Sequence, residues 1–170
     1  MSFSIRPALR EDIPQILAFI HALAEYEREP GAVMATEAGL ERDGFGPNPI
    51  FFCLLAEFDG RPAGFALFFY NYSTWVGRRG IHLDDLFVLP EFRGRGIGKA
   101  LFQRVAAIAV EQGCGRFQWD VLDWNTPAID FYTSMGGRFM DEWRMVRLTG
   151  GALRSAAGLE PSASAPEVRP

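Results

Sequence analysis

The chain has 170 residues, of which 48% are hydrophobic and 14% aromatic, so it is long and apolar enough to bury the core of one globular domain. Its formal net charge is -4, and no basic stretch is interleaved with aromatic residues, which argues against a nucleic-acid partner. Cys53 and Cys114 form no paired motif and there are only two histidines, so we expect free thiols and no metal.

The sequence contains no signal for a membrane. No apolar run approaches the length of a membrane span, and the first residues lack the pattern of a signal peptide. We therefore expect a cytoplasmic protein with no membrane partner.

The amino-terminal half predicts one short strand, two helices and a three-stranded meander. Asp12 is the expected N-cap of the first helix, with Pro14 in its first turn. Glycine and proline make residues 43–49 turn-forming and exclude regular structure there, and Asp59-Gly60 is typical of a hairpin turn. The expected elements are a strand over 3–6, helices from 12 to 25–29 and over 37–42, and strands over 50–58, 62–72 and 80–88.

The carboxyl-terminal half predicts two further helices and two further strands. A helix over 98–112 ends at Gly113, a strand follows over 117–122, and Asn125-Thr126-Pro127 opens a short helix before a last strand over 139–148. Alanine, serine and proline then dominate, so we expect a flexible stretch from Ser155 to Pro170. The predicted organisation is one domain over 1–150 and a flexible tail over 151–170.

The most informative stretch runs from Ile81 to Phe102, where an apolar strand is followed by a glycine-rich turn and an amphipathic helix. Backbone N–H groups at a helix N-terminus form an anion site, and the neighbouring arginines add positive charge. The residues of this turn are Arg93, Gly94, Arg95, Gly96 and Gly98. The pattern therefore predicts a phosphate or pyrophosphate ligand, against the alternative of an ordinary glycine-rich loop.

The spacing of the glycines in this turn reduces the number of candidate ligands. The Rossmann pattern G-x-G-x-x-G does not fit, and a P-loop needs serine or threonine where Ala100 stands. Arg93-x-x-Gly96-x-Gly98 resembles the acetyl-CoA motif of the Gcn5-related N-acetyltransferase (GNAT) superfamily, and the element order β-α-α-β-β-β-α-β-α-β is that of its fold. The resemblance implies an α/β (α+β) fold with a mixed sheet, in which the central strands Ile81–Val88 and Phe117–Leu122 splay apart and flank the acetyl-CoA cosubstrate.

Several segments resemble the spermidine/spermine N1-acetyltransferase (diamine or thialysine acetyltransferase) family more closely. They are Leu23–Glu27, Asp43–Gly46, Trp75–Gly77, Leu83–Val88, Arg93–Gly98 and Asp123–Pro127. The resemblance implies direct acetyl transfer, in a ternary complex, to a primary amine of a polyamine or thialysine-like amino acid by a homodimeric enzyme. Two alternatives stay open: a protein or peptide N-acetyltransferase, and a non-catalytic acyl-CoA-binding regulator.

The same resemblance implies which residues contact the cofactor and which act in catalysis. An alkyl ammonium, with a pKa near 10.4, must lose a proton before it attacks the thioester, and a backbone N–H near Leu86–Val88 is placed to stabilise the oxyanion. Tyr132, in the run Asn125, Ala128, Phe131 and Tyr132, is the expected general acid for the CoA thiolate; the alternative is a core aromatic. The implied cofactor contacts are Phe87, Val88, Arg93, Gly94, Arg95, Gly96, Ile97, Gly98, Lys99, Asn125 and Tyr132.

Acidic and aromatic residues are the expected acceptor-binding set. Asp84 and Asp85 are adjacent on a strand and should point to opposite faces. Asp84 matches a family glutamate and is the expected catalytic carboxylate, holding or deprotonating the ammonium, while Asp85 binds substrate or anchors a neighbouring loop. Tyr26 and Glu27 match the family's acceptor site, with a solvated helix end as the alternative, and Trp75 is either a cation–π wall or a hairpin-packing residue.

Overall fold

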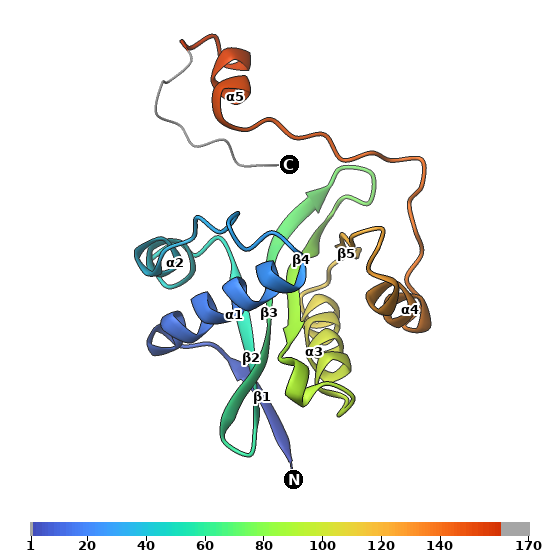
Figure 1. Ribbon diagram of the computed structural model, residues 1–170. Helices are drawn as coiled ribbons and strands as arrows, with labels where there is room; N and C mark the ends of the chain where they lie inside the picture. The colour runs from blue at the N-terminus through green and yellow to red at the C-terminus, as the bar shows by residue number, and fades with distance from the viewer. Residues whose placement is uncertain (1, 161–170) are drawn as a thin grey trace. The chain divides into compact units, whose positions relative to one another are not determined.

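The computed structural model describes residues 2–160, and the part of the predicted flexible tail beyond residue 160 lies outside them. A five-stranded mixed sheet forms its centre, with the strands in sequence order (Figure 1). The first four strands are antiparallel and the fifth is parallel to the fourth. The strands are β1 (Phe3–Pro7), β2 (Phe52–Phe58), β3 (Arg61–Ser73), β4 (Arg78–Val88) and β5 (Phe117–Trp119).

Five α-helices and two short 3-10 helices accompany the sheet. Proline near the start and an apolar stripe explain α1, and the Thr36 side chain caps α2 by accepting a hydrogen bond from the Gly39 amide at 3.1 Å. The helices are η1 (Arg10–Asp12), α1 (Ile13–Tyr26), α2 (Glu37–Gly44), η2 (Pro90–Phe92), α3 (Ile97–Glu111), α4 (Thr126–Ser134) and α5 (Gly150–Ala156). Among the described residues, no helix combines the length and apolar character needed to cross a membrane.

The core on one face of the sheet lies beneath α1 and α2. It consists of Ile13, Ile16 and Phe19 of α1, Leu40 of α2, and Cys53, Leu55, Phe65, Leu67 and Phe87 of the strands. Alternate strand residues point to the opposite face, where α3 packs on β2, β3 and β4. On this α3 side, Ile97, Leu101 and Val105 are almost completely buried. The sheet therefore has an α1 face and an α3 face, each with its own core.

The chain divides into two compact units, one over Met1–Asp120 and one from Val121 onward. The first unit contains the whole sheet and helices α1 to α3. The second contains α4 and α5, and α5 gives residues 150–156 regular structure across the predicted limit of the domain at residue 150. The domain limits of 1–150 and 151–170 stay a prediction.

The predicted last strand over 139–148 is wrong. These residues form no strand in the structure, and six large apolar side chains in this stretch are more than half exposed: Phe139, Met140, Trp143, Met145, Val146 and Leu148. Alternating apolar residues favour a strand only where another strand supplies hydrogen-bond partners, and no described strand pairs with this stretch. The strand predicted over 117–122 likewise ends early, at Trp119, where its pairing with β4 ends.

Two smaller predictions about the amino-terminal half also need correction. Asp43 and Gly44 belong to α2 instead of a turn. Asp12 occupies the N-cap position of α1 but makes no side-chain cap there, because its carboxylate accepts hydrogen bonds from Arg6 and from the Leu9 amide. The guanidinium of Arg6 holds the pKa of this carboxyl below its usual range. Asp12 therefore ties β1 to the start of α1.

Candidate active site

The glycine-rich turn lies between η2 and α3, as predicted. Gly94 has φ 73° and Gly96, the N-cap of α3, has φ 81°, a left-handed conformation that a side chain would make costly. Helix α3 then begins at Ile97, which is only 1% exposed and fixes the helix start in the α3 core. The turn thus presents the first amide groups of α3, together with the positive end of the helix dipole, to an anion.

The two arginines of the turn lie against different aromatic residues. The Arg93 Nε donates to the carbonyl oxygen of Val88 at 2.9 Å. Its guanidinium carbon lies 4.7 Å from the ring centre of Tyr26 and 5.5 Å from that of Phe87. Arg93 is therefore fixed against the end of α1 and the end of β4.

Arg95 extends in another direction. Its guanidinium carbon lies 4.7 Å from the ring centre of Phe58, at the end of β2. Phe58 in turn packs against Phe92 of η2 in a tilted arrangement, with ring centres 5.5 Å apart. The sequence suggested equivalent roles for both arginines, but in the fold Arg93 contacts α1 and β4 whereas Arg95 contacts β2.

Strands β4 and β5 separate as the resemblance implied. They pair over three residues only, the last pair being Leu83 with Trp119, whereas β4 continues to Val88. Residues 84–88 therefore have β3 on one side and no described strand on the other. Backbone groups on such an open edge are available to a ligand, and this opening ends at the glycine-rich turn.

A β-bulge at Asp84 divides β4. Leu67 pairs with Asp85 and Phe68 pairs with Leu83, so Asp84 has no counterpart on β3. Leu83 therefore lies on the α3 face, and the next residue on that face is Leu86, three positions later. Asp85 shares the α1 face with Phe87, while Asp84 is exposed. The predicted simple alternation of Asp84 and Asp85 is interrupted by this bulge.

The two carboxyl groups differ in environment. Asp85 is half-buried on the α1 face, and burial, together with the negative charges of Asp84 and Glu27, raises its pKa to about 7. Burial also raises the pKa of Glu27, which directly follows α1. Asp85 and Glu27 thus form an acidic pair at the end of α1, and Asp85 exchanges its proton near neutral pH.

Gly64 is a site residue that the sequence reasoning missed. A Cβ atom at this position would lie 2.4 Å from the carbonyl oxygen of Phe87, so only glycine lets β3 approach β4 at the open segment. The available signal was a glycine inside an otherwise apolar strand pattern.

Other predicted residues occupy different surroundings. Trp75 lies in the β3–β4 turn and is 89% exposed, so the packing alternative finds no support in burial. His82, on β4, stacks on Phe69 at 4.9 Å between ring centres, and its Nε2 lies 3.7 Å from a carboxylate oxygen of Asp120.

The second unit contains the remaining candidates. Asn125 is 8% exposed, and its carbonyl oxygen accepts the amides of Ala128 and Ile129 at the start of α4. Tyr132 lies on α4 with its ring centre 5.2 Å from that of Phe131. The proposed roles of both residues rest on the sequence resemblance.

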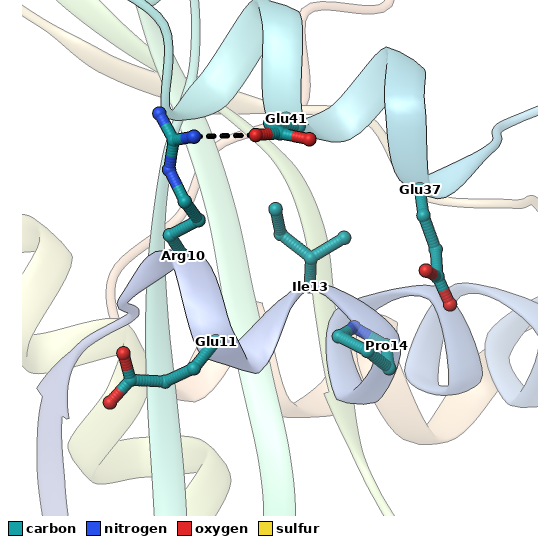
Figure 2. A pocket seen from close by; sticks show the side chains of 6 residues that line it. All are labelled: Arg10, Glu11, Ile13, Pro14, Glu37 and Glu41. Atoms are coloured by element: carbon teal, nitrogen blue, oxygen red, sulfur yellow. Dashed lines mark hydrogen bonds and ion pairs between the residues drawn. The ribbon is translucent and has the colours of Figure 1, made fainter.

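A separate groove of about 350 Å³ lies between η1, the start of α1, and α2, and Figure 2 shows the side chains that line it. Arg10 and Glu41 form an ion pair across it, and Ile13, Pro14, Glu11 and Glu37 complete its lining. None of the predicted cofactor or acceptor residues lines this groove.

A mixed sheet that opens in front of a glycine-rich helix N-terminus, with carboxylates beside the opening, is the arrangement expected of an acyl-CoA-dependent amine acyltransferase. Residues 14–136 match the model of the acetyltransferase (GNAT) family. The chain belongs to this family and is an N-acetyltransferase, which confirms the predicted family and fold. Members of the family use acetyl-CoA as cosubstrate.

Curated relatives extend over nearly the whole chain. A thialysine N-epsilon-acetyltransferase from Sus scrofa is 43% identical over 168 residues, covering 92% of this chain and 98% of the relative. An L-ornithine N5-acetyltransferase from Arabidopsis thaliana is 33% identical over 196 residues, with coverages of 89% and 86%. A human spermidine/spermine N(1)-acetyltransferase-like protein is 38% identical over 141 residues, 79% of this chain but 20% of that protein.

Solved structures support the fold. An integron cassette protein from V. cholerae superposes with a TM-score of 0.76 at 26% identity, covering 92% of this chain and 98% of that one. An aminoglycoside acetyltransferase from a soil metagenomic sample has a TM-score of 0.73 at 16% identity, with coverages of 86% and 95%, and shows the shared fold alone.

Proposed function

We propose that the chain transfers the acetyl group of acetyl-CoA to a primary amine of a small cationic acceptor, with thialysine-like amino acids ahead of polyamines. The observation that carries this proposal is the half-buried Asp85 on the open segment of β4, with Glu27 beside it. The relatives named for thialysine and ornithine favour an amino acid with a terminal amine.

Asp85 is suited to handle the proton of the acceptor ammonium. A carboxylate with a pKa of about 7 is partly ionised at neutral pH and accepts a proton far more readily than an ordinary aspartate. Asp84, exposed at the bulge, and Glu27 attract the cation. We therefore assign proton removal to Asp85 and charge attraction to Asp84, whereas the sequence led us to expect that Asp84 holds or deprotonates the ammonium.

The reaction proceeds by direct attack in a ternary complex. The amine nitrogen, freed of one proton by Asp85, forms a bond to the thioester carbon, and the bond from carbon to sulfur breaks. The nitrogen loses its second proton to solvent as the amide forms, and Tyr132 takes a proton back from solvent after each turnover. Backbone N–H groups of residues 86–88 stabilise the oxyanion, and Tyr132 donates a proton to the departing thiolate. Gly94, Gly96 and the first turn of α3 hold the pyrophosphate of acetyl-CoA, with Arg95 and Lys99 adding charge.

The experiment is to measure CoA release from acetyl-CoA with thialysine, ornithine, lysine, putrescine, spermidine, spermine and a lysine peptide. We expect the highest kcat/KM with thialysine or ornithine. A clear preference for the peptide would establish the protein-acetylating alternative. Tight acetyl-CoA binding without turnover on any amine would contradict the proposal and favour an acyl-CoA-binding regulator.

A further inference from the structure

The end of α1 contacts both functional regions of the first unit. Tyr26, the last residue of α1, lies beneath the guanidinium of Arg93 from the glycine-rich turn. The next residue, Glu27, lies close enough to Asp85 to raise the pKa of that carboxyl. Two adjacent residues thus face the cofactor turn and the acidic pair.

The aromatic contact is a three-membered cluster. Arg93 lies over both Tyr26 and Phe87, whose ring centres are 6.5 Å apart with a 55° angle between the ring planes. The Arg93 Nε bond to Val88 fixes the orientation of the guanidinium. A cation held over an aromatic face is attracted by the ring, and more strongly when water is excluded. Displacement of the glycine-rich turn therefore alters the packing of Tyr26.

Backbone hydrogen bonds at the end of α1 link the position of Tyr26 to that of Glu27. The Glu27 amide donates a hydrogen bond to the carbonyl oxygen of Leu23 at 2.8 Å, and the Glu29 amide donates one to the carbonyl oxygen of Ala24 at 2.9 Å. Arg28 adopts φ 67°, a left-handed conformation in which a non-glycine residue is held only by such surrounding bonds. Tyr26 and Glu27 thus belong to one tightly closed helix terminus.

We infer that Tyr26 and Arg93 are positioning residues that couple the two substrate sites: anchoring of the pyrophosphate on the glycine-rich turn fixes Arg93, which fixes Tyr26 and thereby Glu27 beside Asp85. This inference rests on the proposed function, since it takes CoA as the ligand of the turn. It predicts that CoA orders the end of α1 before any amine binds. Because coupling between two sites is reciprocal, the amine strengthens CoA binding by the same factor.

The chain offers a matched control in Arg95. This arginine comes from the same turn and stacks on Phe58 at the same distance, 4.7 Å, but Phe58 belongs to β2 and not to α1. Phe58→Leu therefore removes an arginine–aromatic contact of the turn without touching the end of α1. Tyr26→Leu removes the corresponding contact on the α1 side, and Tyr26→Phe keeps the ring while removing the hydroxyl.

The test is amide hydrogen exchange, read by mass spectrometry, with and without saturating CoA and with no amine present. In the wild type we expect CoA to slow exchange severalfold in peptides covering 93–98 and 23–30. Tyr26→Leu should retain the first protection and lose the second, whereas Tyr26→Phe and Phe58→Leu should retain both. Equal exchange of the 23–30 peptide in all four CoA-free proteins shows that the helix end is still folded; if Tyr26→Leu frays it, Arg93→Met removes the same contact from the side of the turn and should likewise retain protection of 93–98 and lose that of 23–30.

The possible failures are distinguishable. Protection of 93–98 without protection of 23–30 in the wild type would overturn the coupling and leave the proposed function intact. Loss of the 23–30 protection in Phe58→Leu or in Tyr26→Phe would also overturn it. No protection of either peptide by CoA would contradict the proposed function itself.

A second measurement gives the coupling as a number. Thialysine binding to the wild type should strengthen about 5- to 150-fold when CoA is saturating, the usual range of coupled sites. Tyr26→Leu should reduce this factor toward 1, and Phe58→Leu should leave it unchanged. An unaltered factor in Tyr26→Leu would overturn the inference, whereas absence of thialysine binding would contradict only the proposed acceptor.

Discussion

Residues 81–83 and 84–88 lie on one strand, β4, but in contrasting environments. The first three pair with strands on both sides, and Ile81 and Leu83 are almost completely buried. Of the other five, residues 85–88 pair with β3 alone and Asp84 has no counterpart on β3, and the segment begins with two carboxylates. The β-bulge at Asp84 separates the two halves. One strand therefore serves as a core element where it pairs on both sides and as an open edge beyond Leu83.

The largest effect should come from the open half. Asp85→Asn removes the proposed base while keeping size and shape, so we expect kcat/KM for the acceptor amine to fall about 10²- to 10⁴-fold, the usual contribution of general base catalysis. Asp84→Asn is the matched control and should cost roughly tenfold or less through weaker attraction of the ammonium. Steady-state kinetics with thialysine measure both, and a larger loss in Asp84→Asn would reverse the two roles.

Tyr132→Phe tests the protonation of the CoA thiolate independently of the carboxylates. If Tyr132 protonates the thiolate, kcat should fall about 10²-fold or more while the Kd for acetyl-CoA changes little. Isothermal titration with CoA and steady-state kinetics give the two quantities. An unchanged kcat would exclude Tyr132 as the general acid.

The buried half should respond in stability and not in chemistry. Leu83 is 2% exposed on the α3 face, so Leu83→Ala should lower the free energy of unfolding by about 2–5 kcal/mol through lost burial and the cavity left behind. Its kcat/KM should stay within a few-fold of the wild type at a temperature where both proteins are folded. Urea denaturation and kinetics together measure this, and a Leu83→Ala protein as inactive as Asp85→Asn would contradict the division of β4.

The last predicted effect is a pH dependence of stability. Asp85 has a pKa of about 7 in the folded protein against about 3.9 in an unfolded chain, so folding favours its neutral form. Its contribution to stability is complete below about pH 4 and is lost as the pH rises through 7, by at most about 1.4 kcal/mol per pH unit. Asp85→Asn should therefore gain stability relative to the wild type between pH 4 and 8, as urea midpoints would show. No relative gain would mean that burial of Asp85 costs little.

The sequence predicted most of the first unit because its signals are local. Apolar periodicity identified α1 and the strands, Asp59-Gly60 identified the hairpin, and the spacing of Gly94, Gly96 and Gly98 identified the turn that precedes α3. These features depend on neighbours in the chain, and the structure confirms the elements with shifts of a few residues.

The remaining features depend on residues far apart in the sequence. The bulge at Asp84 follows from its register against β3, and the contact of Arg93 with Tyr26 joins positions 67 residues apart. Residues 139–148 have the alternation of a strand, but pairing requires a partner that the pattern itself cannot supply. The alternation of residues along a strand therefore could not predict the different environments of Asp84 and Asp85.

The most direct test of Asp85 as the proton acceptor is the pH dependence of kcat/KM for thialysine in the wild type, Asp84→Asn and Asp85→Asn. We expect kcat/KM of the wild type and Asp84→Asn to rise with pH through an apparent pKa near 7, because Asp85 must be ionised to accept the ammonium proton. Asp85→Asn should lose this inflection and retain only the rise set by the amine itself near pH 10. An inflection near 7 that persists in Asp85→Asn would contradict the assignment of the open half of β4 as the catalytic edge.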